Sequence, residues 1–411
     1  MNFTALTGRT NGYVLLLAGL MLFVLLGLYC AHVMDMHGHI ITGMNNHVVW
    51  GLPHVFAISL IVAASGALNG ASLSSVFGVS EYKPFARVSV WLAISLLVGG
   101  LLVLVLDLGR PDRLIVAMTH FNFKSIFTWN IFLYTGFIFI GIIYLIVMIE
   151  RPFNHMVGKV GMLAFIWRLI LTTGTGSIFG FLVGRDALDS ALLAPLFIAV
   201  SFALGMAMLT LCILFAMRWR EETANEKLLL SLKQYLRWFL VAVLYFSIVH
   251  HLTNLYIAEH SATQQFALFG PFSIIFWLGH VVIGVIVPWF LLRGSNGISR
   301  LVSASFCAII GSACLLYAII IGSQSTPQRL FPGKTVTSST FGDAGFALYQ
   351  PSVWEWGLGF GGIADALLLC TIGLRLFPFL PPKVSTGHIG QDVGTHGSTG
   401  NGTHSIGEAN V

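Results

Sequence analysis

The dominant pattern along the chain is a series of long apolar runs separated by short polar stretches. A helix needs about 20 apolar residues to cross the hydrocarbon core of a membrane. Runs of that kind lie near residues 13–34, 48–77, 86–107, 125–149, 157–183, 191–217, 235–257, 270–292, 298–321 and 353–376. The pattern therefore predicts an all-α membrane protein with about ten transmembrane helices.

The segments outside this regular pattern divide the chain. The run 48–77 is longer than one crossing requires, so its polar end, residues 69–75, is expected to tilt, kink or leave the membrane. Residues 322–352 form the only long loop. Residues 383–411 are rich in Gly, Ser, Thr and His, and such a composition predicts disorder. Residues 1–382 are therefore expected to form one polytopic membrane domain followed by a disordered tail.

The composition and the charge distribution support this interpretation. The chain is 56% hydrophobic and 9% charged, whereas a soluble domain carries about 25% charged residues. Most of the 21 Lys and Arg residues fall in loops on the side of the N-terminus. This bias predicts that both termini lie in the cytoplasm, and it explains the +5 charge without nucleic-acid binding. The first apolar run is too long for a cleaved signal peptide.

Several patterns of catalytic and metal sites are absent from the sequence. The five cysteines lie in apolar segments and include no C-x-x-C pair, so no zinc or iron–sulfur ligand set is expected. Phosphate-binding loops, nucleophile elbows and H-E-x-x-H motifs are missing, which argues against a hydrolase. A b-type haem stays open as an alternative. The candidate haem ligands are His32, His54, His250, His251 and His280, of which no two form an obvious pair at matching depth.

The first loop on the outer side, residues 32–54, contains five histidines, one acid and no Lys or Arg. Histidine can donate a hydrogen bond to a quinone carbonyl, and it titrates near neutral pH. His32 and Asp35 share one face at the end of the first helix, and Asp35 could accept a released proton. His47, Trp50 and His54 share a face at the start of the second. This loop predicts a quinone and proton-exchange site; a hydrated polar loop is the alternative.

A second cluster of polar residues, in the stretch 104–130, follows on the same outer side. Asp107 ends the third apolar run, and a Gly-Arg-Pro turn breaks the helix there. Arg110 and Arg113 can clamp a carboxylate on a soluble partner, and His120 lies further along the loop. Ion pairs that merely fix the turn are the alternative interpretation.

The order of these motifs resembles a known family. The segment L-D-L-G-R-P-D-R at residues 106–113 precedes Asn122, Ser125 and an apolar run with Trp129, and Tyr349-Gln-Pro-Ser with Glu355 precedes the last helix. These features, spread over residues 10–382, resemble the membrane subunits of the NrfD/polysulfide reductase type. The resemblance extends to the ten-helix branch that contains the DsrP-like and HybB-like subunits.

The resemblance implies a quinone-reactive subunit without haem or metal of its own, in the inner membrane of a bacterial cell. It implies two four-helix bundles, residues 12–150 with the quinone site and residues 151–293, followed by a helix pair at 297–376. The implied partners are a periplasmic ferredoxin-like iron–sulfur subunit and a molybdopterin, hydrogenase or multihaem catalytic subunit. The implied quinone and proton ligands are His32, Asp35, His54, Asp107 and His120. Arg110, Arg113 and Tyr349 are the expected docking residues.

Ionisable and hydroxyl residues inside the predicted helices need a separate explanation. An ionisable group at mid-bilayer costs about 2.5–3.5 kcal/mol on insertion scales, so it usually has a partner and a task. Arg168 and Asp365 are expected near mid-depth and could pair. The candidate proton path comprises Arg168, Thr173, His250, Glu259, His280 and Asp365. Hydrogen bonding between helices is the structural alternative for each.

Two other functions remain compatible with the sequence. A proton-coupled solute transporter without a redox partner also uses many helices and midplane charges, although the two halves of this chain show no repeat. A haem-b membrane anchor is the other. An absorption spectrum would separate the haem anchor from a quinone subunit, and co-purification of a redox partner would separate the transporter.

Overall fold

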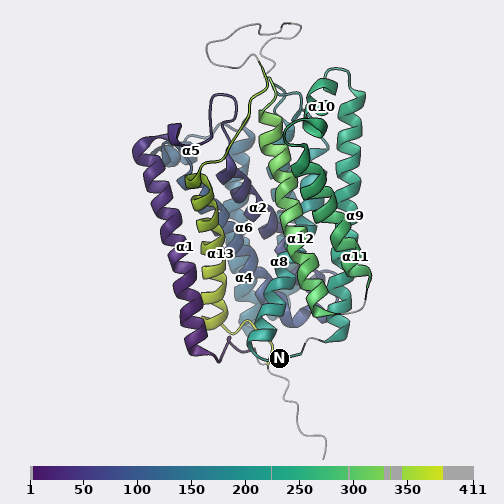
Figure 1. Ribbon diagram of the computed structural model, residues 1–411. Coiled ribbons are helices and arrows are strands. Elements are labelled where there is room, and N and C mark those ends of the chain that lie inside the picture. The colour runs from purple at the N-terminus through teal and green to yellow at the C-terminus, as the bar shows by residue number, and fades with distance from the viewer. Residues whose placement is uncertain (1–2, 224, 295–296, 328–333, 335–344, 383–411) are drawn as a thin grey trace, which may run out of the picture.

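The computed structural model describes residues 3–223, 225–294, 297–327, 334 and 345–382. Ten helical segments in this part of the chain are long and apolar enough to span a membrane, which confirms the predicted all-α membrane protein (Figure 1). The spans are α1 (Thr10–His37), α2 (Leu52–Ala67) with α3 (Asn69–Ser75), η2 (Ser80–Phe85) with α4 (Ala86–Leu106), α6 (Ile126–Ile149), η4 (Arg151–Met156) with α7 (Val157–Gly180), α8 (Leu193–Trp219), α9 (Glu226–Tyr256), η5 (Ile275–Ile286) with α11 (Val287–Arg293), α12 (Ile298–Tyr317) with η6 (Ala318–Gly322), and α13 (Val353–Leu376). The predicted disordered tail, 383–411, and much of the predicted loop 322–352 lie outside the described residues.

The second span is broken at Leu68, as its length suggested. The break separates α2 from α3 and would leave backbone groups unpaired inside the membrane, which is costly. The hydroxyl of Ser89 on α4 repairs it. Its Oγ donates to the Ala67 carbonyl oxygen at 2.6 Å and accepts from the Ala71 N–H at 2.9 Å. A single serine on the neighbouring helix therefore stabilises the kink in a low-dielectric environment.

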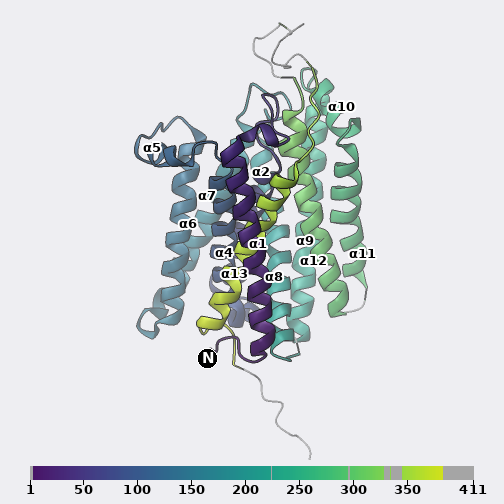
Figure 2. The same ribbon diagram turned by 60° about the vertical axis from the view of Figure 1, so that its left-hand side comes forward.

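The helix α2 lies at the centre of the molecule and α1 at its edge. Among the spans, α2 is the most buried and α1 the least. The helix α2 packs against α4, α8 and α13, while α13 also contacts α1 and α4 (Figures 1 and 2). Small residues allow the closest of these approaches: a Cβ added to Gly205 of α8 would lie 2.0 Å from the carbonyl carbon of Gly66 on α2.

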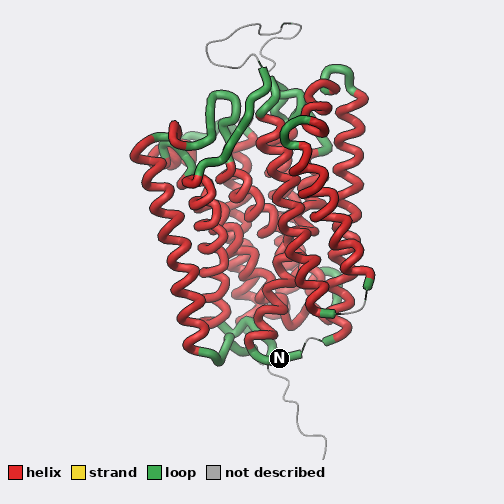
Figure 3. The backbone as a smooth tube through the Cα atoms, viewed as in Figure 1, coloured by secondary structure: helices red, strands yellow, loops and turns green. Residues whose placement is uncertain are grey.

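The connections at the face opposite the N-terminus are longer than those at the N-terminal face (Figure 3). They include the short helices η1 (His39–Ile41), η3 (Pro111–Arg113), α5 (Leu114–Thr119) and α10 (Ser261–Phe269). We call this the outer face, following the predicted orientation. The orientation itself and the division into two bundles stay predictions, because helices from the two expected bundles also pack together, α2 against α8.

Candidate functional site

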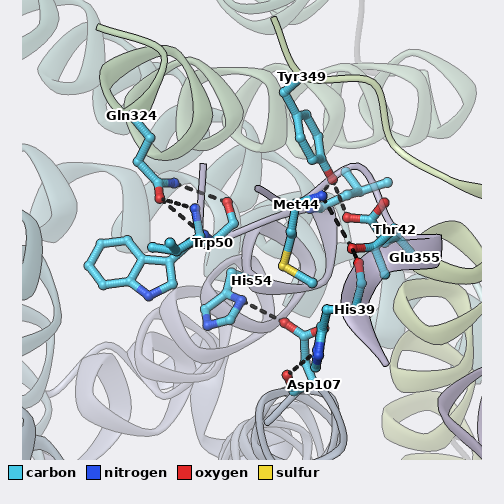
Figure 4. A network of polar contacts seen from close by, with 11 residues as sticks. His39, Thr42, Met44, Trp50, His54, Asp107, Gln324, Tyr349 and Glu355 are labelled. Atoms are coloured by element: carbon cyan, nitrogen blue, oxygen red, sulfur yellow. Dashed lines mark hydrogen bonds and ion pairs between the residues drawn. The ribbon is translucent and has the colours of Figure 1, made fainter. Parts of the chain in front are cut away.

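A histidine–aspartate pair with a buried carboxylate lies just below the outer face. Asp107 follows the last turn of α4, and His54 lies in the first turn of α2. Because α2 and α4 pack side by side and run in opposite directions, the end of one meets the start of the other. His54 Nδ1 lies 2.7 Å from Asp107 Oδ2, and only 1% of the Asp107 side chain is exposed (Figure 4). A carboxylate buried this deeply needs a donor or a cation, and the His54 imidazole is within reach.

A pocket of about 280 Å³ lies between the outer ends of α1 and α4; Leu106 and Leu108, the sequence neighbours of Asp107, line it, whereas His54 and Asp107 do not. His32 and Asp35 from α1 line it, as does His39 from η1. The His39 ring nitrogen Nε2 lies 3.1 Å from the backbone oxygen of Asp107, so His39 links the pocket to the pair (Figure 4). The sequence placed His39 in the histidine-rich loop but gave no reason to prefer it over the other histidines there. Only the fold of η1 brings it over the end of α4.

An aromatic side chain covers His54 on the other side. The Trp50 ring stacks on the imidazole with 6.2 Å between ring centroids. Gln324 fixes the Trp50 backbone: its Oε1 accepts from the Trp50 N–H and its Nε2 donates to the Trp50 carbonyl oxygen, both at 3.0 Å (Figure 4). Edge-on contacts with Phe127 and Phe179 complete this wall. The imidazole of His54 is therefore held in one orientation, with Asp107 at one nitrogen.

His47 and Arg185 form a second polar group behind Trp50. The Arg185 guanidinium donates to the backbone oxygens of Gln324 at 2.6 Å and of His47 at 2.7 Å. Burial lowers the pKa of Arg185 from its usual value. The His47 side chain is buried, and neither ring nitrogen has a hydrogen-bond partner among the described residues. Buried polar atoms of this kind usually bond to water or a ligand, so His47 is a further candidate contact that only its spacing from His54 had indicated.

A fully buried carboxylate ties the outer loops together. Glu355, in the first turn of α13, accepts from the Tyr349 hydroxyl, from the Gly43 N–H at 2.8 Å and from the Ser352 N–H at 2.7 Å (Figure 4). The Tyr349 hydroxyl in turn accepts from the Leu52 N–H at 2.6 Å. Burial, together with the Glu355 carboxylate, raises the pKa of Tyr349, so its hydroxyl stays a donor. We call this hydrogen-bond network around Tyr349 and Glu355 the latch. It fixes the start of α2, which carries His54.

The expectation that Tyr349 docks a partner is wrong. Its side chain is buried, and its hydroxyl is occupied by Glu355 and Leu52. The sequence motif around residues 349–355 therefore has a positioning role. Two other expected docking residues, Arg110 and Arg113, are exposed on the outer face, where Arg110 pairs with Asp112 at 3.3 Å. Their contact with a partner stays a prediction.

We expect Tyr349→Phe to destabilise the protein without abolishing folding. The change removes one donor from the buried Glu355 carboxylate and leaves the Leu52 N–H without an acceptor, which costs about 1–3 kcal/mol. The thermal unfolding midpoint of the protein in detergent should fall by several degrees. The matched control is Tyr256→Phe, because Tyr256 is 91% exposed. Equal midpoints for the two variants would contradict the latch.

His120, the last of the expected quinone ligands, lies apart from the His54–Asp107 pair. His120 is exposed in the outer loop after α5, where its Nδ1 lies 3.0 Å from the Thr119 hydroxyl. No contact joins it to His54 or Asp107 within the described part of the chain. His120 therefore lies apart from the pocket that His32 and Asp35 line.

The interior residues of α7 are arranged differently from the expectation. Arg168 is completely buried, donates to the Ser65 carbonyl oxygen at 3.1 Å and packs its guanidinium over Phe202. No ion pair joins it to Asp365 in the described structure, so the suggested pairing is wrong. Thr173 points outward from the helix bundle, because its exposed side chain bonds only to its own helix. The hydroxyl that faces the interior is that of Thr172, which hydrogen-bonds to Ser65 Oγ at 2.6 Å.

A chain of buried polar groups runs through the outer half of α9. His250 contacts Ser190 Oγ at 3.2 Å and Asn254 at 3.3 Å, and His260 contacts the same Asn254 at 3.3 Å. His280, in the π-helix η5, lies 3.3 Å from the Ser247 hydroxyl of α9. Glu259 is exposed at the outer end, beside His260. The sequence had indicated His250, His280 and Glu259 but had missed His260 and Ser190.

Comparison with known proteins identifies this arrangement of helices and outer loops. Residues 41–328 match the family model described as polysulphide reductase, NrfD. The chain belongs to the NrfD family. The matched range includes His54, Asp107, Arg168 and the polar chain along α9, whereas His39 and Glu355 lie outside it. The NrfD-family assignment and the ten spans make the chain a multi-pass integral membrane protein.

Several known proteins are similar to this NrfD-family chain over most of its length. The Hdr-like menaquinol oxidoreductase integral membrane subunit of Archaeoglobus fulgidus is 29% identical over 93% of this chain and 98% of its own. A selenate reductase subunit of Mesobacillus selenatarsenatis is 22% identical over 86% of this chain and 91% of its own. A putative dimethyl sulfoxide reductase membrane subunit of Halobacterium salinarum is 27% identical over 83% and 86% of the two chains.

Proposed function

We propose that the protein is the quinone-binding membrane subunit of a respiratory oxidoreductase complex. The observation that carries the proposal is the His54–Asp107 pair, linked through His39 to the pocket that His32 and Asp35 also line. The printed name of the Archaeoglobus relative, a menaquinol oxidoreductase membrane subunit, supports a quinone as the substrate. The quinone would be menaquinone or ubiquinone, bound near the outer face.

The chemistry follows from the orientation of His54. With Nδ1 directed at Asp107, the other ring nitrogen has no hydrogen-bond partner among the described residues and can accept a proton from a quinol hydroxyl. Oxidation of one quinol to a quinone releases two protons and two electrons. One proton passes to His54, whose imidazolium the Asp107 carboxylate stabilises; the second leaves through His39 and Asp35. Both electrons pass to a redox centre of a partner subunit, and reduction of the quinone reverses each step.

The proposed partner is an extrinsic ferredoxin-like iron–sulfur subunit on the outer face, predicted to be periplasmic. It would connect the quinone site to a molybdopterin, hydrogenase or multihaem catalytic subunit. The names of the selenate reductase and dimethyl sulfoxide reductase relatives support a catalytic partner. Arg110 and Arg113 are exposed close to the Asp107 turn, where they would bind an acidic surface of the partner. Docking there would bring the partner's redox centre close to the quinone site.

Coupling to proton translocation is a finer part of the proposal. The polar chain formed by His250, Asn254 and His260 reaches the outer end of α9, where Glu259 is exposed. His280, Arg168 and Asp365 lie deeper, and Asp365 is half-buried on α13. These groups offer hydrogen-bonding positions for a proton path from the interior to the outer face.

Quinone binding tests the proposal directly. The complex, extracted in mild detergent, should retain quinone and an iron–sulfur protein, and it should bind a naphthoquinol analogue. His54→Gln should weaken that binding about 10–100-fold, as expected for loss of a hydrogen bond involving a charged group. His155→Gln is the matched control, since His155 is exposed at the opposite face. A stable chain that binds no quinone and brings no redox partner would favour a transporter, and a Soret band would favour a haem anchor.

A further inference from the structure

A second pocket, distinct from the quinone site, opens at the face that carries the N-terminus. Its volume is about 1220 Å³, and it lies between the ends of α3 and α6 and the starts of α4 and α7. The 3₁₀ helices η2 and η4 contribute to its walls. This face is opposite to the outer face, where α5 and α10 lie (Figure 2); His54, in the first turn of α2, and Asp107, after the last turn of α4, lie toward the outer face. Nothing in the proposed quinone chemistry uses it.

The charged residues that line this pocket are all basic. They are Lys83 from η2, Arg87 from α4 and Arg151 from η4, and no acid is among the lining residues. None of the three forms an ion pair within the described part of the chain. Glu81 and Glu150 are sequence neighbours of this cluster but do not line the pocket. The lining therefore carries a net positive charge, which attracts an anion.

The guanidinium of Arg87 is held in place by the protein itself. It donates to the backbone oxygens of Pro378, at 3.1 Å, and of Met148, and it lies over the Phe3 ring at 3.8 Å. These are neutral partners, so they fix the orientation of the group without cancelling its charge. A guanidinium presents five N–H donors in a rigid fork that matches a phosphate. Arg87 is therefore preorganised for a phosphate group in a way that a freely moving surface residue is not.

The neutral lining residues suit a phospholipid. The Ser74 hydroxyl and the Asn154 amide provide further hydrogen-bond donors, whereas the Ser75 and Ser80 hydroxyls donate to the Ala71 carbonyl oxygen and the Glu81 carboxylate. Met148 and Ile149, at the end of the α6 span, add an apolar side where acyl chains begin. A volume of about 1220 Å³ far exceeds that of one small ion, since a water molecule occupies about 30 Å³ in the liquid. A headgroup with its glycerol fits these dimensions better.

We propose that this pocket binds the phosphate-containing headgroup of an anionic phospholipid, at the surface that the charge bias predicts to be cytoplasmic. Basic pockets between transmembrane helices on that side of a membrane are a recurring mode of anionic lipid recognition. The bound lipid bridges η2, η4 and the end of α6, all of which line the pocket. It thereby fixes the start of α4, whose outer end carries Asp107.

Lipid titration followed by native mass spectrometry tests this inference on the purified protein. The probes are phosphatidylglycerol and cardiolipin, with phosphatidylcholine as the neutral comparison. We expect the anionic lipids to bind at least about tenfold more tightly than phosphatidylcholine. The double variant Lys83→Gln/Arg151→Gln should lower this preference about fivefold or more. It leaves Arg87, with its backbone contacts, intact.

The matched control is Lys159→Gln/Lys227→Gln, which removes the same charge from exposed residues outside the pocket. It should keep the lipid preference. Equal loss in both double variants, or no loss in either, would overturn the proposal. Displacement of the lipid by millimolar inorganic phosphate would assign the pocket to a soluble anion instead. The single variants Lys83→Gln and Arg151→Gln, each expected to lose part of the preference, serve if the double variant does not fold.

Discussion

We expect Asp107→Asn to lower quinol-linked electron transfer by about 10²–10⁴-fold, the range that a positioned acid–base group typically contributes. The carboxylate lies 2.7 Å from His54 Nδ1, and within the described structure the imidazole has no other polar partner at that nitrogen. Asparagine keeps the size of the side chain but removes the charge that stabilises an imidazolium. His54 then loses both its fixed tautomer and its ability to accept the quinol proton.

The measurement is the rate of quinol oxidation by the purified complex as a function of pH. Asp112→Asn is the control, because Asp112 belongs to the same turn but 63% of its side chain is exposed. Its surface ion pair with Arg110 is worth at most about 1 kcal/mol, so the rate should change little. A folded Asp107→Asn complex with wild-type activity across the pH range would rule out the pair as the proton acceptor.

Gly205→Val is expected to produce the largest loss of stability of any single change considered. A Cβ at this position would lie 2.0 Å from the carbonyl carbon of Gly66 and 2.3 Å from the amide nitrogen of Ala67. The obstructing atoms are backbone atoms of α2, which cannot rotate away as a side chain can. Overpacking in a core costs about 1–3 kcal/mol when side chains can adjust, and more when they cannot. We therefore expect α2 and α8 to be forced apart at their central contact.

The yield of monodisperse protein and its thermal unfolding midpoint measure this effect. Gly19→Val provides the comparison within the same fold, because a Cβ at Gly19 of α1 meets nothing within 4 Å. Both variants carry the same intrinsic helix propensity change, so the difference between them isolates the close approach of the helices. Comparable yields and midpoints would show that α2 and α8 can separate without cost.

The sequence predicted the membrane-spanning elements well because one physical requirement dominates them. Each crossing must be long, apolar and internally hydrogen-bonded, and the ten observed spans correspond to the ten apolar runs. The largest difference is at α9, which begins at Glu226 although the apolar run begins near 235. Its first turns are amphipathic and lie outside the strictly apolar run. A Lys227 N–H bond to the Asn225 side chain caps the extended helix.

Polar side chains within the spans were harder to place. The sequence cannot tell which of two adjacent threonines on α7 faces the interior, because neighbours on a helix differ by about 100° and the apolar pattern surrounds the whole helix. The structure places Thr172 inward, bonded to Ser65, and Thr173 outward. Arg168 likewise contacts a backbone carbonyl oxygen and aromatic rings, although the sequence had suggested an acidic partner.

The sequence by itself determined the number of spans, the family resemblance and the two outer loops that hold the candidate chemistry. Tertiary structure alone decided which of their residues meet. His54 contacts Asp107 because α2 and α4 are antiparallel neighbours, His39 returns through η1, and Tyr349 is buried against Glu355 from α13. The physical reason is that lipid solvates all apolar helix faces alike. Hydropathy therefore fixes what crosses the membrane, while close packing and buried hydrogen bonds fix which helices become neighbours.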